Sequence, residues 1–374
     1  MRLLEARVHA IEWLCDGVIG IDLRPCAMEN WPVVTAGAHI DLLLPNGLTR
    51  SYSLTNRPGE AHRYTVAVAM DAASRGGSIF VHNNLKVGQK ISISAPRNHF
   101  PVDESTSHSV FIAGGIGITP IWCMVQRLSQ IGSSWEIHYS ARARVNAAFV
   151  DEVVTLAEQT GNVVHLNFDG GVRERMLDIN SLVASQESGT HLYSCGPAPM
   201  LKAFDQACQG RDPATVHREY FAAPVSSNAD ATTDEEIELV LSRTNIRIKV
   251  DEKTSILDAV LAAGVDVPYS CMSGLCRACE TPVLSGTPDH RDLVLTDAER
   301  NSGTTMMICC SRSKSRELVL DLKPAGATPA WRHGNYASKW IDTALFAWIL
   351  RCSEAGMRGI TPRHDSRPFS RPSD

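Results

Sequence analysis

The sequence predicts a multi-domain protein in which an antiparallel β-barrel is followed by an α/β domain with a parallel sheet and then by a smaller α+β domain. Its 374 residues are 44% hydrophobic, enough for two or three domains with cores of their own. After His108 the hydrophobic pattern changes from short strands to strands that alternate with helices. Beyond residue 235 a hairpin and a short helix precede a cluster of cysteines.

The first predicted domain, residues 1–103, consists of short strands separated by turn residues. Turns are indicated at Asn46-Gly47, Pro58-Gly59 and Val87-Gly88. The strands are expected at 2–13, 17–24, 39–45, 50–55, 63–70 and 90–96. This spacing is typical of an antiparallel barrel or sandwich.

The second predicted domain, residues 104–222, alternates strands with helices. The strands are expected at 109–114, 135–139, 163–167 and 191–194, and the helices at 122–130, 149–159 and 199–207. This alternation predicts a parallel sheet that is covered on both faces.

The third predicted domain, residues 235–323, follows a linker at 223–234 that is rich in Ala, Ser, Thr and Asp. Two strands at 237–242 and 246–250 form a predicted hairpin, and SILDAVLAAG is expected to be a short helix that ends at a glycine. The cysteine cluster comes directly after this helix.

Charge gives no reason to expect nucleic acid as a partner, because 36 Lys and Arg are balanced by 41 Asp and Glu. Residues 324–374 are predicted to form an irregular extension. Their apolar run at 340–350 is shorter than the roughly 20 residues that span a bilayer, so a membrane is not expected as a partner, with a peripheral membrane helix as the alternative. The first residues lack the features of a secretory signal, and the cysteines are clustered rather than spread as a disulfide framework. A cytoplasmic location is therefore expected.

Three cysteines, Cys271, Cys276 and Cys279, form a C-x4-C-x2-C pattern, and Cys309 follows far downstream as a fourth candidate. This spacing is typical of plant-type 2Fe–2S ferredoxins. Zinc is the alternative, but structural zinc sites usually present two close pairs of ligands rather than a triplet and a single cysteine. If MMICC is a strand, only one of its two adjacent cysteines can face the cluster, and the pattern favours Cys309 over Cys310.

Two glycine-containing loops indicate a nucleotide site. The segment IAGGIGITP places Gly114, Gly115, Gly117 and Thr119 between a strand and a helix, where backbone amides can approach a pyrophosphate. Alone, such a turn is equally consistent with tight packing. A second loop, SCGPAPM at 194–200, moves the balance toward a dinucleotide.

Two weaker motifs lie in the first domain. RSYSL places Arg50 and Tyr52 on one face of a strand and Ser53 on the other, but an ordinary sheet edge looks the same. SRGGS at 74–78 offers an arginine, flexible backbone and a hydroxyl, which suits a phosphate as well as a plain turn.

Taken in order, RSYSL, SRGGS, PRNHFP, AGGIGITP, CGPAPM and the cysteine pattern resemble the phthalate dioxygenase reductase and vanillate O-demethylase reductase family, over about residues 3–322. The resemblance implies a ferredoxin-NADP-reductase-like chain with a β-barrel FMN domain, a NAD-binding domain and a C-terminal β-grasp ferredoxin domain. FMN, NADH and a 2Fe–2S cluster are the implied cofactors. The set is coherent, because nicotinamide releases two electrons as hydride, the cluster accepts one, and flavin converts between the two.

The resemblance also assigns residues. Arg50 would pair with the flavin phosphate, Tyr52 would pack on the isoalloxazine, and Ser53 would bond near flavin N5. The implied cofactor-binding residues are Arg50, Tyr52, Ser53, Gly76, Gly77, Ser78, Gly114, Gly115, Gly117, Thr119, Gly196 and Pro197. The implied catalytic residues are Ser53, Cys195 and Phe221, with Tyr220 as a rival to Phe221. The implied iron ligands are Cys271, Cys276, Cys279 and Cys309.

The implied function is that of the reductase component of a two-component Rieske-type aromatic oxygenase or O-demethylase. Contact with the oxygenase would be transient and would use the surface around Met272, Leu275 and Arg277. The alternatives are an NAD(P)H reductase of a separate ferredoxin or non-Rieske monooxygenase, and a non-enzymatic redox-sensing iron–sulfur or zinc protein. NADH is expected from the family, although Arg142 and Arg144 would suit the 2′-phosphate of NADPH.

Overall fold

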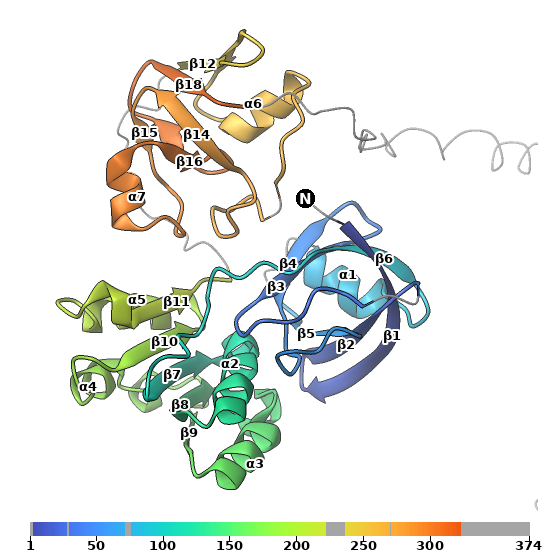
Figure 1. The fold of residues 1–374 in the computed structure, drawn as a ribbon, viewed down its shortest axis with the longest axis vertical. Helices are drawn as coiled ribbons and strands as arrows, with labels where there is room; N and C mark the ends of the chain where they lie inside the picture. Colours follow the sequence, from blue (N-terminus) through green and yellow to red (C-terminus); the bar gives the residue numbers. More distant parts are fainter. Residues whose placement is uncertain (1–2, 28–29, 72–75, 222–235, 270, 323–374) are drawn as a thin grey trace, which may run out of the picture. The chain divides into compact units, whose positions relative to one another are not determined.

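The computed structural model describes every residue except 1–2, 28–29, 72–75, 222–235, 270 and 323–374. The described residues form a six-stranded sheet and two five-stranded sheets, with a further two-stranded ribbon (Figure 1). Each large sheet falls in one of the three predicted domains, which confirms the fold class. The predicted linker and C-terminal extension lie outside the described residues, and the domain limits stay predictions.

The first sheet is antiparallel and has the strand order β4-β3-β6-β1-β2-β5. An isolated bridge between Leu54 and Val66 joins the chain just after β4 to β5, so the two edges of the sheet meet and the barrel closes. All six strands were expected from the sequence. They are β1 (Leu3–Cys15), β2 (Val18–Pro25), β3 (His39–Leu43), β4 (Thr49–Ser53), β5 (Tyr64–Ala69) and β6 (Lys90–Ser94).

One element of this domain was missed. No helix was expected after SRGGS, which suited a phosphate as well as a plain turn, but Gly77–Asn84 is the helix α1. The residue before it, Gly76, has a φ of 87°, a backbone conformation that glycine adopts without steric cost. The two glycines thus mark the start of a helix, and Gly77 and Ser78 belong to its first turn.

The second sheet is parallel throughout, with the order β11-β10-β7-β8-β9. The expected strands and helices are all present. Two elements, α4 and β11, were not expected. The elements are β7 (His108–Gly114), α2 (Ile118–Ile131), β8 (Ser134–Ala141), α3 (Val150–Thr160), β9 (Val163–Phe168), α4 (Ile179–Ala184), β10 (His191–Cys195), α5 (Ala198–Ala207) and β11 (Val216–Glu219).

Alternate side chains of β7 lie on opposite faces of this sheet. Phe111 belongs to the same apolar core as α2, α3 and the barrel, whereas Val110 and Ile112 pack with α4 and α5 in a second core. The expectation of a sheet covered on both faces is therefore confirmed.

The third sheet is mixed and has the order β13-β12-β18-β14-β16. Its central pair, β12 and β18, is parallel, whereas β12 and β13 form the expected antiparallel hairpin. The expected helix is α6 (Ile256–Ala262), and the Ser255 side chain caps it by accepting a hydrogen bond from the amide of Asp258. The other elements are β12 (Ile237–Leu241), β13 (Ile246–Val250), β14 (Glu280–Ser285), β15 (Pro288–Asp289), α7 (Asp297–Ser302), β16 (Thr305–Met307), β17 (Arg312–Ser313) and β18 (Glu317–Leu320).

The described helices are short, and the longest, α2, has 14 residues. In the part of the chain that the structure describes, no helix is both long and apolar enough to cross a membrane. The apolar run at 340–350 lies outside the described residues.

Candidate redox site

Four cysteine thiols converge in the third domain. The thiol of Cys271 contacts those of Cys276 and Cys309, and the thiol of Cys279 also contacts that of Cys309. These contacts raise the pKa of Cys271 and Cys279 and lower the pKa of Cys276 and Cys309. Three of the four residues come from the loop between α6 and β14, and the fourth follows β16. A set of four thiolates from one loop and one distant segment fits a 2Fe–2S cluster.

Backbone amides of the loop point at the sulfurs. The amides of Ser273 and Leu275 lie 3.4 and 3.3 Å from Cys271 Sγ, and the amide of Cys271 lies 3.4 Å from Cys276 Sγ. Gly274 is required in this loop, because its φ is 71° and a Cβ atom there would lie 2.5 Å from Cys310 Sγ. Amide donors stabilise anionic sulfur, so this backbone suits thiolate ligands.

The condition that MMICC is a strand is not met, so alternation along a strand does not decide between Cys309 and Cys310. β16 ends at Met307, and the next three residues form a turn. The thiol of Cys309 is buried against those of Cys271 and Cys279, whereas the Cys310 thiol contacts that of Cys309 alone among the described cysteines and lies 3.8 Å from the carbonyl oxygen of Met307. Thiol contacts, rather than strand alternation, therefore favour Cys309.

Part of the surface that was expected to contact a partner, the side chain of Arg277, makes contacts within its own domain instead. Arg277 has a φ of 53°, and its guanidinium lies 2.6 Å from Glu299 and 3.5 Å from Glu280. Contact with Arg277 lowers the pKa of Glu299 to about 2. Met272, by contrast, is 47% exposed. The ion pair of Arg277 thus holds the loop against α7, and Met272 is more available to contact a partner.

The flavin motif lies on β4, beside the start of α1. Arg50, Tyr52 and Ser53 line one pocket together with Glu219 and Phe221. A Cβ atom at position 77 would lie 2.5 Å from Nε of Arg50, so a larger residue there would have to displace the Arg50 side chain. An arginine beside the amino end of a helix is a suitable phosphate site, so these residues fit the phosphate of FMN.

Sequence reasoning missed Glu219, the last residue of β11. Ser53 Oγ lies 3.4 Å from Glu219 Oε2, and burial raises the pKa of this carboxyl to about 8. The signal was present in HREYF, where an acid stands two residues before the proposed ring of Phe221. A carboxyl that stays protonated at neutral pH therefore faces the same pocket as Tyr52 and Ser53.

A larger cavity of about 790 Å³ lies at the carboxyl ends of the parallel strands. Its position is the one at which open α/β sheets bind nucleotides. Residues that line it include Gly114, Gly115, Gly117, Ser140, Arg142, Asp169, Gly196, Pro197 and Phe221. Glycine backbone at the start of α2 and a cavity of this size fit a dinucleotide.

The glycine turn at the start of α2 lines the cavity and is also closely packed against the end of β10. A Cβ atom on Gly117 would lie 2.1 Å from the carbonyl oxygen of Cys195, so any larger residue must displace the turn. Thr119 does not line the cavity; its hydroxyl donates to the carbonyl of Ile116 and holds the turn. Both residues are thus placed to shape the turn.

Cys195 itself is fully buried and lines neither pocket. Burial, followed by the charge of Glu219 on the neighbouring strand, raises the pKa of this thiol. The structure gives Cys195 a packing position beneath the turn, and its catalytic role stays a prediction.

Of the two aromatic candidates, Phe221 is 43% exposed and lines both pockets. The hydroxyl of Tyr220 donates to Asp205 at 2.7 Å, which ties that ring to α5. The two arginines also differ. Arg142 lines the nucleotide cavity, whereas Arg144 forms an ion pair with Asp151.

Comparison with known proteins agrees with this geometry. Residues 239–314 match the 2Fe-2S iron-sulfur cluster binding domain, and residues 111–206 match the oxidoreductase NAD-binding domain. The chain is 51% identical over 323 residues to phenoxybenzoate dioxygenase subunit beta of Ectopseudomonas oleovorans, covering 86% of this chain and 98% of that protein. It is 42% identical to vanillate O-demethylase oxidoreductase of Pseudomonas sp. (strain HR199 / DSM 7063), covering 86% and 100%.

Two solved structures are also similar. Phthalate dioxygenase reductase, described as a modular structure for electron transfer from pyridine nucleotides to [2Fe-2S], matches with a TM-score of 0.63 and 34% identity over 86% of this chain and 98% of that chain. An intact type IV self-sufficient cytochrome P450 monooxygenase matches with a TM-score of 0.76 and 38% identity, over 86% of this chain and 41% of that one.

Proposed function

Because the chain belongs to this family of oxygenase and demethylase reductases, we propose that it passes electrons from NADH through FMN and a 2Fe–2S cluster to a separate oxygenase. One observation carries the proposal: a single chain combines a nucleotide cavity, a pocket with an arginine and a helix start, and four converging thiols. Flavin supplies the conversion from hydride to single electrons, and side chains need only bind and orient.

On this proposal the residues of the β4 pocket hold the flavin and one proton. Arg50 and the amides at the start of α1 would bind the phosphate. Tyr52 would contact the ring system. The Glu219 carboxyl and Ser53 hydroxyl form a hydrogen-bonded pair that holds a proton beside the ring at neutral pH.

The nucleotide cavity supports NADH over NADPH. Asp169 lines it and is buried, with its Oδ1 accepting a hydrogen bond from the amide of Gly171 at 2.6 Å. This carboxylate opposes the charge of Arg142, and Arg144 is paired elsewhere. A dianionic 2′-phosphate would therefore meet a less favourable field than a ribose hydroxyl.

The electron acceptor is proposed to be the Rieske centre of an aromatic oxygenase or O-demethylase, reached in a transient complex. The similarity to a cytochrome P450 monooxygenase supports a haem monooxygenase as the second candidate. The redox-sensing alternative does not account for the nucleotide cavity. Assays of the reduced protein with one acceptor of each kind distinguish the two candidates by their transfer rates.

We propose a cytoplasmic location from the cysteines. All ten cysteines in the described part of the chain are free. Free thiols persist in the reducing cytoplasm, where a thiolate-bound cluster is also stable.

An anaerobic NADH titration followed by visible absorbance tests the proposal. The parent protein should lose both its flavin and its cluster absorbance. Cys276→Ser should lose the cluster but keep NADH-dependent flavin reduction. Protein that contains iron but neither binds flavin nor oxidises NADH would overturn the proposal, and repeating the titration with NADPH tests the nucleotide preference.

A further inference from the structure

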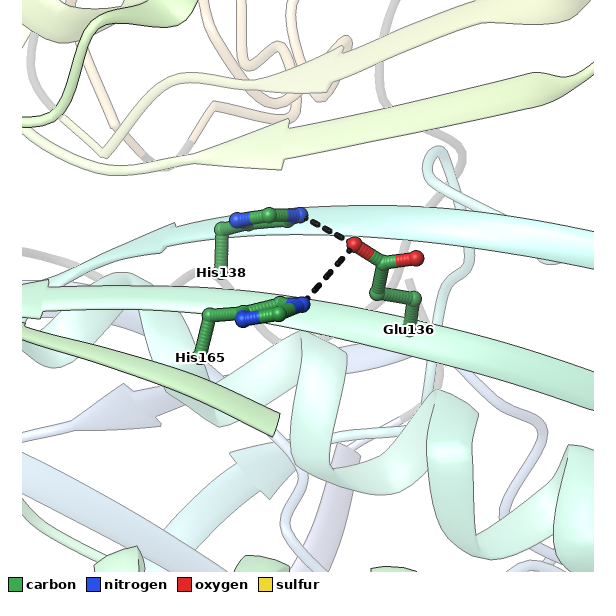
Figure 2. Close-up of side chains that lie close together, drawn as sticks. All are labelled: Glu136, His138 and His165. Carbon is green, nitrogen blue, oxygen red and sulfur yellow. Dashed lines mark hydrogen bonds and ion pairs between the residues drawn. The ribbon is translucent and has the colours of Figure 1, made fainter. Parts of the chain in front are cut away.

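A cluster of two imidazoles and one carboxylate lies in the second domain, away from the residues assigned above. Glu136 and His138 are two residues apart on β8, so both side chains point to the same face of the sheet. His165 comes from β9, the edge strand, and is paired in register with His138 (Figure 2). The two strands therefore fix the spacing of the three groups.

The ligand atoms of this cluster converge. Glu136 Oε1 lies 2.5 Å from His138 Nε2 and 3.2 Å from His165 Nε2. The imidazole rings stack with centroids 4.5 Å apart and an angle of 16° between their planes. Figure 2 shows both Nε2 atoms turned toward the same carboxylate oxygen. One possible ligand atom from each residue thus lies within 4.8 Å of the other two.

The cluster interrupts an apolar surface. On this face of the sheet, Val110 and Ile112 of β7 pack with α4 and α5. Glu136 and His138 are their register partners on β8, and these side chains are only 22% and 14% exposed. His165 is 53% exposed and leaves a route from solvent. Partly buried polar groups that converge at an open edge suit an ion that enters from solvent.

We propose that Glu136, His138 and His165 bind a divalent transition-metal ion such as Zn²⁺. Zinc takes histidine nitrogen at about 2.0–2.1 Å and carboxylate oxygen at about 2.0–2.2 Å, which places tetrahedral ligand atoms about 3.3 Å apart. The separation between Glu136 and His165 already has this value. The separation between Glu136 and His138 must lengthen by a little under about 1 Å, which rotation of the glutamate side chain can provide.

Such an ion would join the edge strand to the rest of the sheet. β8 continues from His138 to Ser140, which lines the nucleotide cavity. The ion would thus join β9 to β8 at His138, two residues before Ser140. An ion that binds only the folded state also raises thermal stability. The other reading is a hydrogen-bonded triad that holds no ion.

Zinc uptake by the full-length protein, carrying its flavin and cluster, distinguishes these readings. The protein is dialysed against Zn²⁺ buffered at set free concentrations, and bound zinc and iron are counted by elemental analysis. The parent should bind one saturable zinc per chain while keeping its iron, and its Tm should rise with zinc. His165→Gln and Glu136→Gln should each weaken zinc binding at least about tenfold and lose the rise in Tm.

The matched control is His62→Gln, which removes an exposed imidazole of the barrel domain and should bind zinc like the parent. His165 lies on an exposed edge, so its replacement should leave the fold and the iron content unchanged. A parent protein that takes up no saturable zinc would overturn the proposal. Equal zinc uptake by the parent and His165→Gln would overturn it as well, because the ion would then lie elsewhere.

Discussion

The cluster loop and the flavin pocket are built in opposite ways. In the cluster loop, three of the four thiols come from one short segment, and only Cys309 is brought from a distance. In the flavin pocket, Ser53 and Glu219 are 166 residues apart and meet only because β4 and the end of β11 line the same space. Spacing along the chain can specify a site of the first kind but not of the second.

The largest effect, and the sharpest test of this contrast, is expected from replacing each of the adjacent cysteines Cys309 and Cys310 in turn. Cys309→Ser should lose the cluster and reduce electron transfer to an oxygenase or ferredoxin at least about 100-fold, because a ligand is removed. Cys310→Ser is the matched control and should keep its iron and stay within about twofold of the parent. Iron analysis and single-turnover transfer measure both. Retained iron in the first variant and lost iron in the second would reverse the assignment.

The next largest effect is expected at the glycine turn. Gly117→Ala places a methyl group 2.1 Å from the carbonyl oxygen of Cys195, and such overpacking costs about 1–3 kcal/mol. We expect the KM for NADH to rise by about 10–100-fold, since the displaced turn lines the nucleotide cavity. Gly189→Ala, with no atom within 4 Å of the added Cβ, is the control. A KM within about twofold of the parent in Gly117→Ala would show that the turn tolerates the shift.

A smaller effect, on stability, is expected at Glu219. Its pKa is raised from 4.5 to about 8, so between these values the folded state holds a proton that the unfolded state has released. The free energy of unfolding therefore falls as pH rises through this window. In Glu219→Gln, the free energy of unfolding should fall less over this pH range than in the parent, by on the order of 1–3 kcal/mol.

Denaturant unfolding at about pH 5 and about pH 8 measures this change. Glu158→Gln removes an exposed carboxylate and should retain the pH dependence of the parent. The same slope in Glu219→Gln and the parent would contradict the assigned protonation.

The smallest effect is expected for nucleotide preference. Arg142→Ala should lower kcat/KM with NADPH by about three- to tenfold and leave NADH within about twofold, because this guanidinium lines the cavity. Arg144→Ala is the matched variant and should change neither, since Arg144 is paired with Asp151. Steady-state kinetics with both nucleotides decide the outcome. A larger effect at Arg144 would show that its ion pair opens when nucleotide binds.

The sequence by itself determined the architecture and the local motifs. Short strand-like runs separated by turn residues revealed every barrel strand, and strand–helix alternation revealed the parallel sheet. The cysteine spacing at 271–279 predicted three ligands of a 2Fe–2S cluster, an assignment that stays a prediction. Short elements such as α4 and α7 were missed, although the Thr296–Glu299 capping box could have revealed the second.

Only the tertiary structure decided what depends on distant partners. It placed Glu219 beside Ser53, buried Cys195 under the glycine turn, and brought the thiol of Cys309 to those of Cys271 and Cys279. It also brought His165 to His138 through the register of two parallel strands. The physical reason is common to all four: packing sets the contacts and burial that fix a side chain's chemistry, and spacing along one segment does not encode them.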